Sequence, residues 1–235
     1  MNQNNHSDFV TSPFSNKFGI TIYPYKLPDS FIIKFNDEYL IDNKVKKIDG
    51  IGSINCFCTA QLQKLFQSYN ILTSYLDSHS EKELVYKNFQ KIPIVVRVLN
   101  FSDKNLAKVF ESSPKEKLLT PIFEFYFNNN RKISLNEYHL LAFGVLSIED
   151  SRQIIKIASK INAILKSFFD RRGYDLVEIP LEFGKINNQI VHTSIFTADS
   201  IKIKPKNDNN LSFDFSVTRP TKIKEVFLNF QKLIY

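Results

Sequence analysis

The segment from Ser134 to Gly184 constrains the fold most, because it carries the most regular apolar pattern in the chain. Ser147 and Asp150 resemble a capping box before this pattern, and Gly173 is the residue type that commonly follows a helix end. YDLVEIPLEF comes next and predicts a strand. We therefore predict a long helix followed by a strand. The helix stripe consists of Ile154, Ile157, Ala158, Ile161, Ile164, Leu165 and Phe168.

Runs rich in β-branched and aromatic residues predict further strands. They are FGITIY and SFIIKF within residues 18–41, IPIVVRVLNF at 92–101 and PIFEFYF at 121–127. After the strand at 174–183, the turn INNQ and the run IVHTSIF predict a hairpin. IDGIGSIN at 48–55 predicts a glycine-bearing turn, and SHSEKELVYK at 78–87 predicts a polar connection.

Two other apolar patterns predict helices. One contains Leu62, Leu65, Phe66 and Tyr69. The other begins at Pro220 and contains Ile223, Val226, Phe227, Phe230, Leu233 and Ile234. Because strands and helices are mixed rather than strictly alternating, we expect an α+β fold.

The 235 residues suffice for one domain or two intimate lobes, and their 43% hydrophobic content is that of a globular protein. No apolar run reaches the length of a membrane span. Residues 1–16 lack the basic and apolar parts of a secretory signal, so we expect a flexible tail. Cys56 and Cys58 are too few for a thiolate metal site, and a disulfide between them would be strained. Reduced, buried thiols suit the cytoplasm or an organelle matrix.

The net charge of +7 and the isoelectric point of about 9.2 favour polyanionic partners. Nucleotides, RNA of a larger assembly and acidic proteins all fit, and no DNA specificity is evident. The alternative is a solvated lysine-rich surface in a chain whose composition is typical of AT-rich coding sequences. The lysines cluster at Lys44, Lys46 and Lys47, at Lys202, Lys204 and Lys206, and at Lys222 and Lys224.

Several motifs occur in a fixed order along the chain: IDGIGSINC, NILTSYL, PIFEFYFNNN, LNEYHLLAFG and KSFFDRRGYDLVEIPLEFG. This order resembles IDGKGxxNN, GIPTHFI, PIVEFYYKDD and INEDHILAFG, followed by a helix ending in FF, in the SAICAR synthetase (phosphoribosylaminoimidazole-succinocarboxamide synthase) family. The resemblance runs from about residue 17 to 204. It implies a kinase-like two-lobed fold, with a β-rich lobe at 17–91 and a larger α+β lobe with a C-terminal helix at 92–235.

The resemblance also implies a reaction. The family uses Mg-ATP to activate the carboxylate of carboxyaminoimidazole ribotide, which the nitrogen of aspartate then attacks. In an active member, the resemblance assigns catalysis to Arg97, Glu178, Glu182, Asp199 and Lys202, with Glu182 the candidate metal ligand. It assigns nucleotide or substrate binding to Lys17, Asp49, Gly50, Gly52, Asn55, Asn100, Lys108 and Ser200.

Many positions depart from the family pattern. The two phosphate-facing lysines of the first strand match Phe18 and Ile20, unless a one-residue slip brings Lys17 near. Arg97 stands two residues from the match of the substrate arginine and is expected on the same strand face. The other departures are Ile51 at a lysine, Val95 at an acid, Leu99 at the arginine, Lys104 and Asn105 at a Gly-Ser pair, Asn128, Asn129 and Asn130 at acids, Lys132 and Ile133 at an Asp-Pro pair, Pro180 at a lysine, and Ser194 and Ile195 at an Asp-Glu pair.

Two main hypotheses follow, and a nucleotide sensor or an unrelated transferase on the same fold is a further alternative. The first is a pseudoenzyme that keeps the family scaffold, needs no cofactor, and serves as a binding or structural subunit. Its apolar replacements would fill a cleft that no ligand enters. The second is a divergent working enzyme that uses ATP and Mg²⁺ and ligates aspartate to the ribotide in purine biosynthesis. Binding of Mg-ATP distinguishes them, because only the second hypothesis requires it.

Overall fold

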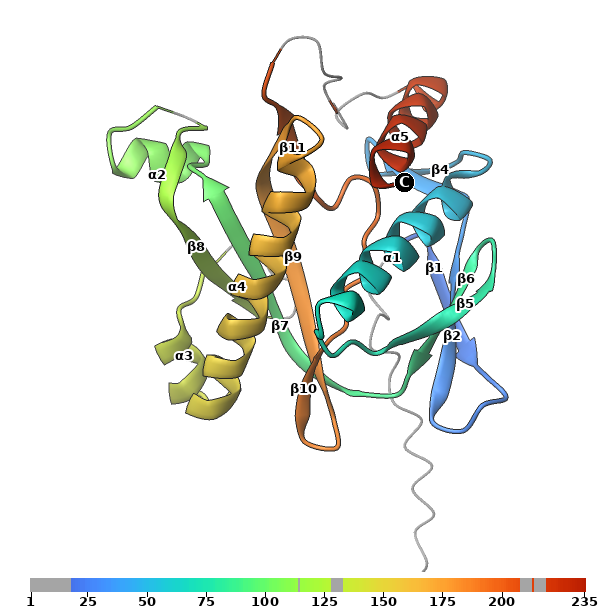
Figure 1. Ribbon diagram of the computed structural model, residues 1–235, viewed down its shortest axis with the longest axis horizontal. Coiled ribbons are helices and arrows are strands. Elements are labelled where there is room, and N and C mark those ends of the chain that lie inside the picture. The colour runs from blue at the N-terminus through green and yellow to red at the C-terminus, as the bar shows by residue number, and fades with distance from the viewer. Residues whose placement is uncertain (1–17, 114, 128–132, 208–212, 214–218) are drawn as a thin grey trace, which may run out of the picture.

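The computed structural model describes residues 18–113, 115–127, 133–207, 213 and 219–235. Helices and strands are mixed along the chain, as Figure 1 shows, and the α+β class is confirmed. The helices are α1 (Ile51–Ser68), α2 (Lys104–Val109), α3 (Glu137–Ala142), α4 (Ile148–Asp170) and α5 (Pro220–Ile234). The strands are β1 (Ile20–Pro24), β2 (Ser30–Phe35), β3 (Glu38–Ile41), β4 (Lys44–Lys47), β5 (Tyr75–Ser80), β6 (Glu83–Lys87), β7 (Gln90–Phe101), β8 (Lys117–Phe127), β9 (Tyr174–Ile186), β10 (Gln189–His192) and β11 (Lys202–Pro205).

Two antiparallel sheets organise the chain. The first has the order β1-β2-β6-β5, and the second has the order β10-β9-β7-β8 with β11 added beside β9. A short bridge joins them, since Ser74 donates its backbone N–H to His192 (3.0 Å) and His192 donates to Leu72 (2.9 Å). Helix α1 contacts the first sheet, α4 contacts the second, and α5 packs on α1. The hairpin β3–β4 forms a separate two-stranded ribbon.

The long helix is confirmed as α4. Ser147 caps it by accepting a hydrogen bond from the backbone N–H of Asp150 at 3.0 Å, which satisfies a donor that has no partner inside the helix. The helix ends at Asp170, and Gly173 has a φ of 80°, which costs a residue without Cβ little. The inward stripe of Ile154, Ala158, Ile161 and Leu165 is fully buried.

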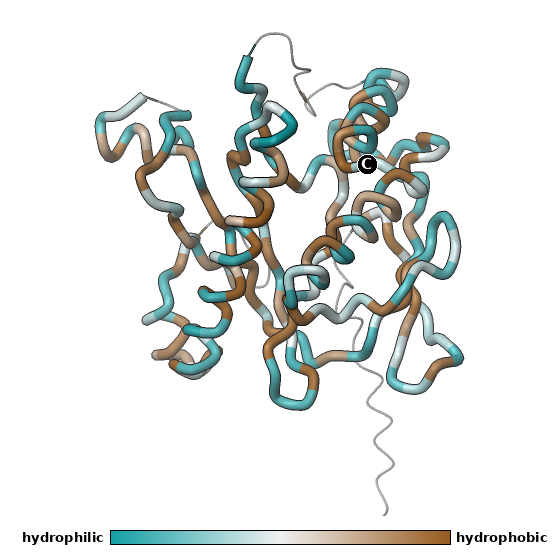
Figure 2. Tube along the Cα trace, viewed as in Figure 1, coloured by the Kyte–Doolittle hydropathy of each residue, from teal (hydrophilic) through white to brown (hydrophobic). Residues whose placement is uncertain are grey.

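Two apolar cores result, and Figure 2 shows hydrophobic residues where the helices meet the sheets. The larger core lies between β7, β9 and helices α1, α4 and α5. The smaller core joins the inner face of β2 to α1, β5 and β6, and it also receives Val191 and Ile195 from the C-terminal half. Ile20 and Ile22 of β1 pack at its edge. Apolar contact therefore connects the first sheet to the segment that follows β9.

The turn predicted for IDGIGSIN is wrong beyond its first three residues, because α1 begins at Ile51. Gly50 has a φ of 91° and precedes the helix. The first turn is capped from a distance, since Asp37 accepts a hydrogen bond from the Gly52 N–H at 3.0 Å. A capping residue fifteen positions upstream leaves no local sequence signal, which explains why the helix start was missed.

The polar connection predicted for SHSEKELVYK is also wrong. Its residues form most of the hairpin β5–β6, whose Leu84, Val85 and Tyr86 are buried. The predicted strand IVHTSIF ends at His192, and residues 193–196 bond to α1 side chains instead. Thr59 donates to the Phe196 carbonyl at 2.7 Å, and Gln63 donates to the Ser194 carbonyl at 2.7 Å.

The hairpin predicted around INNQ is confirmed as β9–β10, with Asn187 and Asn188 at positive φ. The helix predicted from Pro220 is confirmed as α5, with proline in its first turn. The elements α2, α3, β4 and β11 were not predicted, whereas β3 lies within residues 18–41, which were predicted to form short strands. The lobe boundary at residues 91 and 92 stays a prediction; it falls inside β7, which begins at Gln90.

Cys56 and Cys58 are free and buried in α1, and burial raises the pKa of each thiol to about 12. Such thiols stay protonated near neutral pH and are poor nucleophiles. Within the described residues, no helix is both long enough and apolar enough to cross a membrane.

Candidate functional site

The candidate site lies on one face of the second sheet, where β7 runs between β8 and β9. The register is regular from Ile94 to Leu99, so Val95, Arg97 and Leu99 share this face, as predicted. Arg97 lies opposite Glu124 of β8 and Pro180 of β9. Strand pairing therefore fixes one cation at the centre of a three-strand surface.

Arg97 contacts a carboxylate on each neighbouring strand and a third on Asp103, the residue that caps the following helix. Its guanidinium donates to Asp103 and to Glu124, each at 2.9 Å, and to Glu178 at 2.7 Å. Lys202 of β11 also donates to Glu178, at 2.8 Å. We call these five residues the Arg97 cluster. Because it sets three carboxylates against two cations, its formal charge is negative when all five residues are ionised.

Burial and ion pairing act in opposite directions on these carboxyl groups. Burial alone would raise the pKa of Glu178, whose side chain is only 5% exposed, but hydrogen bonds from Arg97 and Lys202 hold the pKa below its ordinary value. Burial also opposes ionisation of Asp103, yet the α2 backbone N–H groups and Arg97 lower its pKa. Both groups are therefore charged near neutral pH.

Asp103 links the cluster to α2. Its carboxylate accepts hydrogen bonds from the N–H groups of Asn105 and Leu106, both at 2.9 Å, and so caps the helix while it pairs with Arg97. The position of α2 thus depends on Arg97. The cluster lines a pocket of about 430 Å³, a volume typical of small-molecule sites. The other lining residues are Asn105, Leu106, Val109, Tyr126 and Ser134.

The structure brings together three of the five predicted catalytic residues: Arg97, Glu178 and Lys202. Glu182 lies further along β9, opposite Val95, and does not line this pocket. Asp199 also lies outside the lining, and it accepts a hydrogen bond from Thr197 at 2.6 Å. The catalytic roles stay predictions, but only the first three residues share a pocket.

The predicted binding residues near α1 make contacts within the fold. Asn55 accepts a hydrogen bond from the Ala198 N–H at 3.0 Å, and Ser200 donates to the Thr197 carbonyl at 2.7 Å. At Gly52, a Cβ would lie 2.5 Å from the Phe35 carbonyl oxygen. Asp49 is exposed and lies 3.6 Å from Lys47. Lys108 is exposed on α2, and Lys17 lies outside the described residues.

Asn100 is buried, and its amide faces another amide. It donates to Asn162 of α4 at 2.8 Å and accepts from Asn162 at 3.0 Å. This reciprocal pair fastens α4 to β7. It also occupies a donor and an acceptor that a ligand would otherwise use.

Replacing Asn100 or Asn162 singly with alanine is expected to destabilise the protein by about 1–3 kcal/mol, because each change leaves a buried amide without its partner. The double replacement should cost less than the sum of the two. Urea denaturation of the four proteins in the cycle measures this coupling. Strictly additive losses would mean that the two amides do not act as a pair.

At the positions where the family resemblance implies charged groups for Mg²⁺ and nucleotide phosphates, the residues of this chain do not suit these ligands. Ile51 is fully buried, and Leu99 and Ile195 are 1% and 5% exposed, so none offers a cation or carboxylate. The Ser194 hydroxyl accepts a hydrogen bond from the Glu182 backbone N–H at 2.7 Å. In the described part of the chain, no group of three or more His, Cys, Asp or Glu residues could hold a metal.

Sequence reasoning missed Asp103, Glu124 and Tyr126 of this pocket. Two of them carried usable signals. Glu124 lies between apolar neighbours in the predicted strand PIFEFYF, and alternation places it on the opposite face from Phe123 and Phe125. Asp103 precedes a short helix, where aspartate is a favoured cap.

These observations define a class of protein: an α+β fold with two sheets and a polar pocket beside the central strands of the second sheet. Comparison with protein families matches the chain to the SAICAR synthetase family over residues 20–232. The chain therefore belongs to the SAICAR synthetase family, and the resemblance and its fold are confirmed.

Several relatives have the name phosphoribosylaminoimidazole-succinocarboxamide synthase. One from Clostridium botulinum (strain Langeland) is 27% identical over 211 residues, which cover 88% of this chain and 90% of the relative. One from Wolbachia sp. subsp. Brugia malayi is 36% identical over 180 residues, which cover 75% and 74%. These names favour the hypothesis of a working synthetase over that of a pseudoenzyme.

Solved structures agree on the fold. The synthase from Ehrlichia chaffeensis has a TM-score of 0.80 and 25% identity, covering 92% of this chain and 95% of its own. A SAICAR synthetase solved in complex with ADP has a TM-score of 0.81 and 26% identity, covering 92% and 94%. The architecture of this chain is thus that of a family member known to bind a nucleotide.

Proposed function

We propose that this SAICAR synthetase homologue serves as a non-catalytic binding or structural subunit. One observation carries the proposal: Ile51, Leu99 and Ile195 are buried apolar side chains at three positions where family members are expected to have charged groups. Ile51 and Ile195 pack in the apolar cores, and Leu99 lies beside Glu178 in the sheet. Ile195 belongs to the smaller core, which connects the first sheet to the segment after β9. Loss of one group that stabilises charge in a transition state costs about 10²–10³ in rate, so several losses remove most of the catalysis.

The Arg97 cluster supports the same proposal. A displaced arginine could replace the one lost at Leu99 only if its guanidinium were available to an anionic substrate. Three carboxylates within 2.9 Å already surround it. An anion would have to displace at least one of them and would meet a surface with excess negative charge. Arg97 therefore suits a structural ion-pair network better than a phosphate or carboxylate site.

The test is formation of SAICAR by the purified chain. The assay supplies Mg-ATP, aspartate and carboxyaminoimidazole ribotide, and a competent SAICAR synthetase serves as the positive control. We expect a rate indistinguishable from that without protein, together with no saturable binding of Mg-ATP by calorimetry. A cooperative thermal transition of the same sample shows that it is folded. Turnover well above the blank would overturn the proposal.

The second candidate is a divergent working synthetase, which the names and coverage of the relatives favour. In that case ATP and Mg²⁺ are needed, and Arg97, Glu178 and Lys202 are the residues that already share a pocket. Lys202 is the best placed of the three to meet a ligand, because its side chain is 57% exposed. Turnover that is lost in Lys202→Ala would support this candidate.

A further inference from the structure

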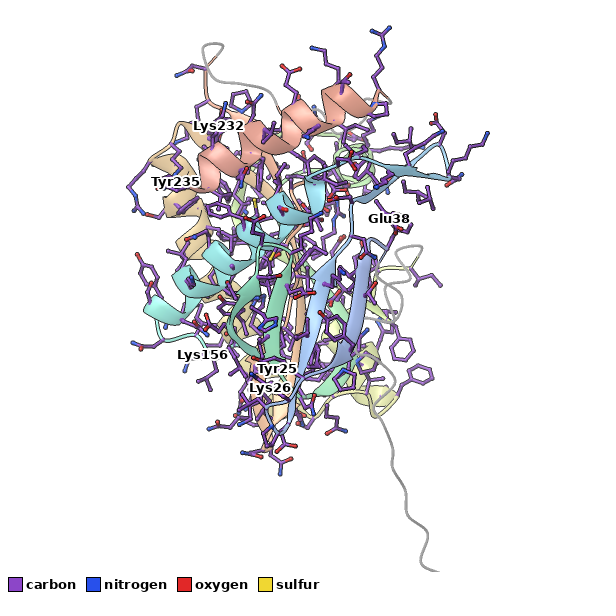
Figure 3. The ribbon with its side chains drawn as sticks, turned by 90° about the vertical axis from the view of Figure 1, so that its right-hand side faces the viewer. Tyr25, Lys26, Glu38, Lys156, Lys232 and Tyr235 are labelled. Atoms are coloured by element: carbon purple, nitrogen blue, oxygen red, sulfur yellow. The ribbon has the colours of Figure 1, made fainter. Side chains whose placement is uncertain are left out.

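A group of basic side chains gathers where the hairpin β3–β4 meets the start of α5. We call it the basic surface; it consists of Lys44, Lys46, Arg219, Lys222 and Lys224. All of these side chains except that of Lys224, which is half-buried, lie exposed. The hairpin projects beside the first turn of α5, as Figures 1 and 3 show. Two segments almost 180 positions apart in the sequence therefore contribute to one surface.

Specific contacts hold the two segments together. Tyr39 of β3 meets Phe227 of α5 edge to face, with ring centroids 5.4 Å apart. Within the hairpin, Tyr39 pairs with Lys46 and Ile41 pairs with Lys44, so both lysines lie on the face that turns toward α5. Lys224 of α5 also reaches the residue before α1, since its ammonium lies 3.5 Å from the position that a Cβ would take at Gly50.

The basic surface is poorly neutralised. Glu225 pairs with Lys222 at 3.1 Å, and Asp42 lies in the turn of the hairpin. Across the described residues, no carboxylate lies within ion-pair distance of the other four cations. The first turn of α5 also contains no acidic residue. Within the part of the chain that the structure describes, Lys222 is the one member of the basic surface with an ion pair, which leaves a field that attracts polyanions.

The side chains on this face select the kind of polyanion. A protein partner usually needs an apolar or aromatic anchor at the centre of its interface. Here the apolar residues of this face, Tyr39 and Ile41, are packed against the core. The exposed apolar pair, Leu40 and Val45, lies on the opposite face of the hairpin. A nucleic-acid backbone needs only spaced cations.

From this geometry we propose that the basic surface binds the phosphate backbone of single-stranded RNA without reading its bases. The lysines of β4 are two residues apart, about 7 Å along a strand, so both can contact one extended chain. Arg219, Lys222 and Lys224 at the start of α5 provide further cations that the same extended chain can contact. This inference goes beyond the proposed function and is independent of catalysis.

Fluorescence anisotropy with a labelled oligouridylate of about 20 nucleotides tests the proposal. Salt is varied from about 50 to about 250 mM, because each neutralised phosphate contributes about −0.7 to the slope of log K against log salt. About four contacts predict a slope near −3. The variant Lys44→Gln/Lys46→Gln should bind at least about tenfold more weakly at low salt, with a slope shallower by about 1.4.

The matched control is Lys26→Gln/Lys156→Gln. It removes the same charge from two exposed lysines that lie far from the hairpin, as labelled in Figure 3, and should bind like the parent. Equal weakening in both double variants would overturn the proposal, since it would reveal only an effect of net charge. Failure of the parent protein to bind RNA at about 50 mM salt would also overturn it. So would equally tight binding of an acidic polypeptide in place of RNA.

Discussion

Replacing Arg97 with alanine is expected to destabilise the protein by about 3–5 kcal/mol, the largest effect of any single change considered. The change removes the partner of Asp103, Glu124 and Glu178 at once. Glu178 suffers most, because its side chain is only 5% exposed and keeps Lys202 alone as a cation. Urea denaturation at pH 7 measures the free energy of unfolding.

The effect should depend on pH with a defined sign. Ion pairing holds the pKa of Glu178 and Asp103 below their ordinary values, so the parent protein gains stability above about pH 4 and loses it as pH falls further. Without Arg97, both carboxyl groups lose one of the partners that lower their pKa, so the pKa of each is expected to be higher than in the parent. Protonation at lower pH then removes the cost of burying a carboxylate without that partner. The difference between parent and Arg97→Ala should therefore shrink as pH falls from 7 toward 4.

Two further variants make this result specific. Arg152 is exposed on α4, and Arg152→Ala should change stability by less than about 0.5 kcal/mol. Arg97→Lys keeps the charge but lacks the planar fork that contacts three carboxylates, so an intermediate loss is expected. If Arg97→Ala were no less stable than Arg152→Ala, the Arg97 cluster would not hold the strands and α2 together.

Replacing Gly52 with alanine should also destabilise the protein, by about 3 kcal/mol. In most helices this exchange stabilises by about 1 kcal/mol, so even the sign is informative. The added Cβ would lie 2.5 Å from the Phe35 carbonyl oxygen and 3.0 Å from the Asp37 carboxylate. The first contact is with backbone in the core and is hard to relieve, and the second disturbs the cap of α1.

The adjacent variant Ser53→Ala is the control, because it also places an alanine in the first turn of α1 but adds no Cβ. It should be neutral or slightly stabilising. Thermal unfolding of both variants beside the parent is sufficient. A Gly52→Ala protein as stable as the parent would show that α1 can move away from β2.

The accuracy of the sequence predictions depended on where the causes of structure lie. The helix from Ile148 to Asp170 was predicted because its cap, stripe and terminal glycine are all local. The start of α1 was missed because its cap, Asp37, belongs to another segment. Strand β6 was missed because its apolar residues Leu84, Val85 and Tyr86 form a run of only three after a longer polar run, so the segment as a whole is polar.

For the candidate site, alternation along β7 was enough to place Arg97 on the face of Leu99. It could not supply the partners of Arg97, which come from three other elements. Register between β7, β8 and β9 decides that Glu124 and Glu178 meet Arg97, and register is a tertiary property. The charge balance of the site therefore emerged only from the assembled sheet.

The packing of α5 on α1 has a consequence for the order in which the chain folds. Tyr235 stacks on Phe57 with ring centroids 6.1 Å apart, and Phe227 meets Tyr39. During synthesis, part of the apolar face of α1 therefore stays exposed until α5 is made, more than 150 residues later. Contacts between residues far apart in the sequence slow folding, and they leave partly folded intermediates whose exposed apolar surface favours aggregation. Nascent chains of this protein should depend on chaperones until α5 leaves the ribosome, and a chain truncated before Pro220 should aggregate.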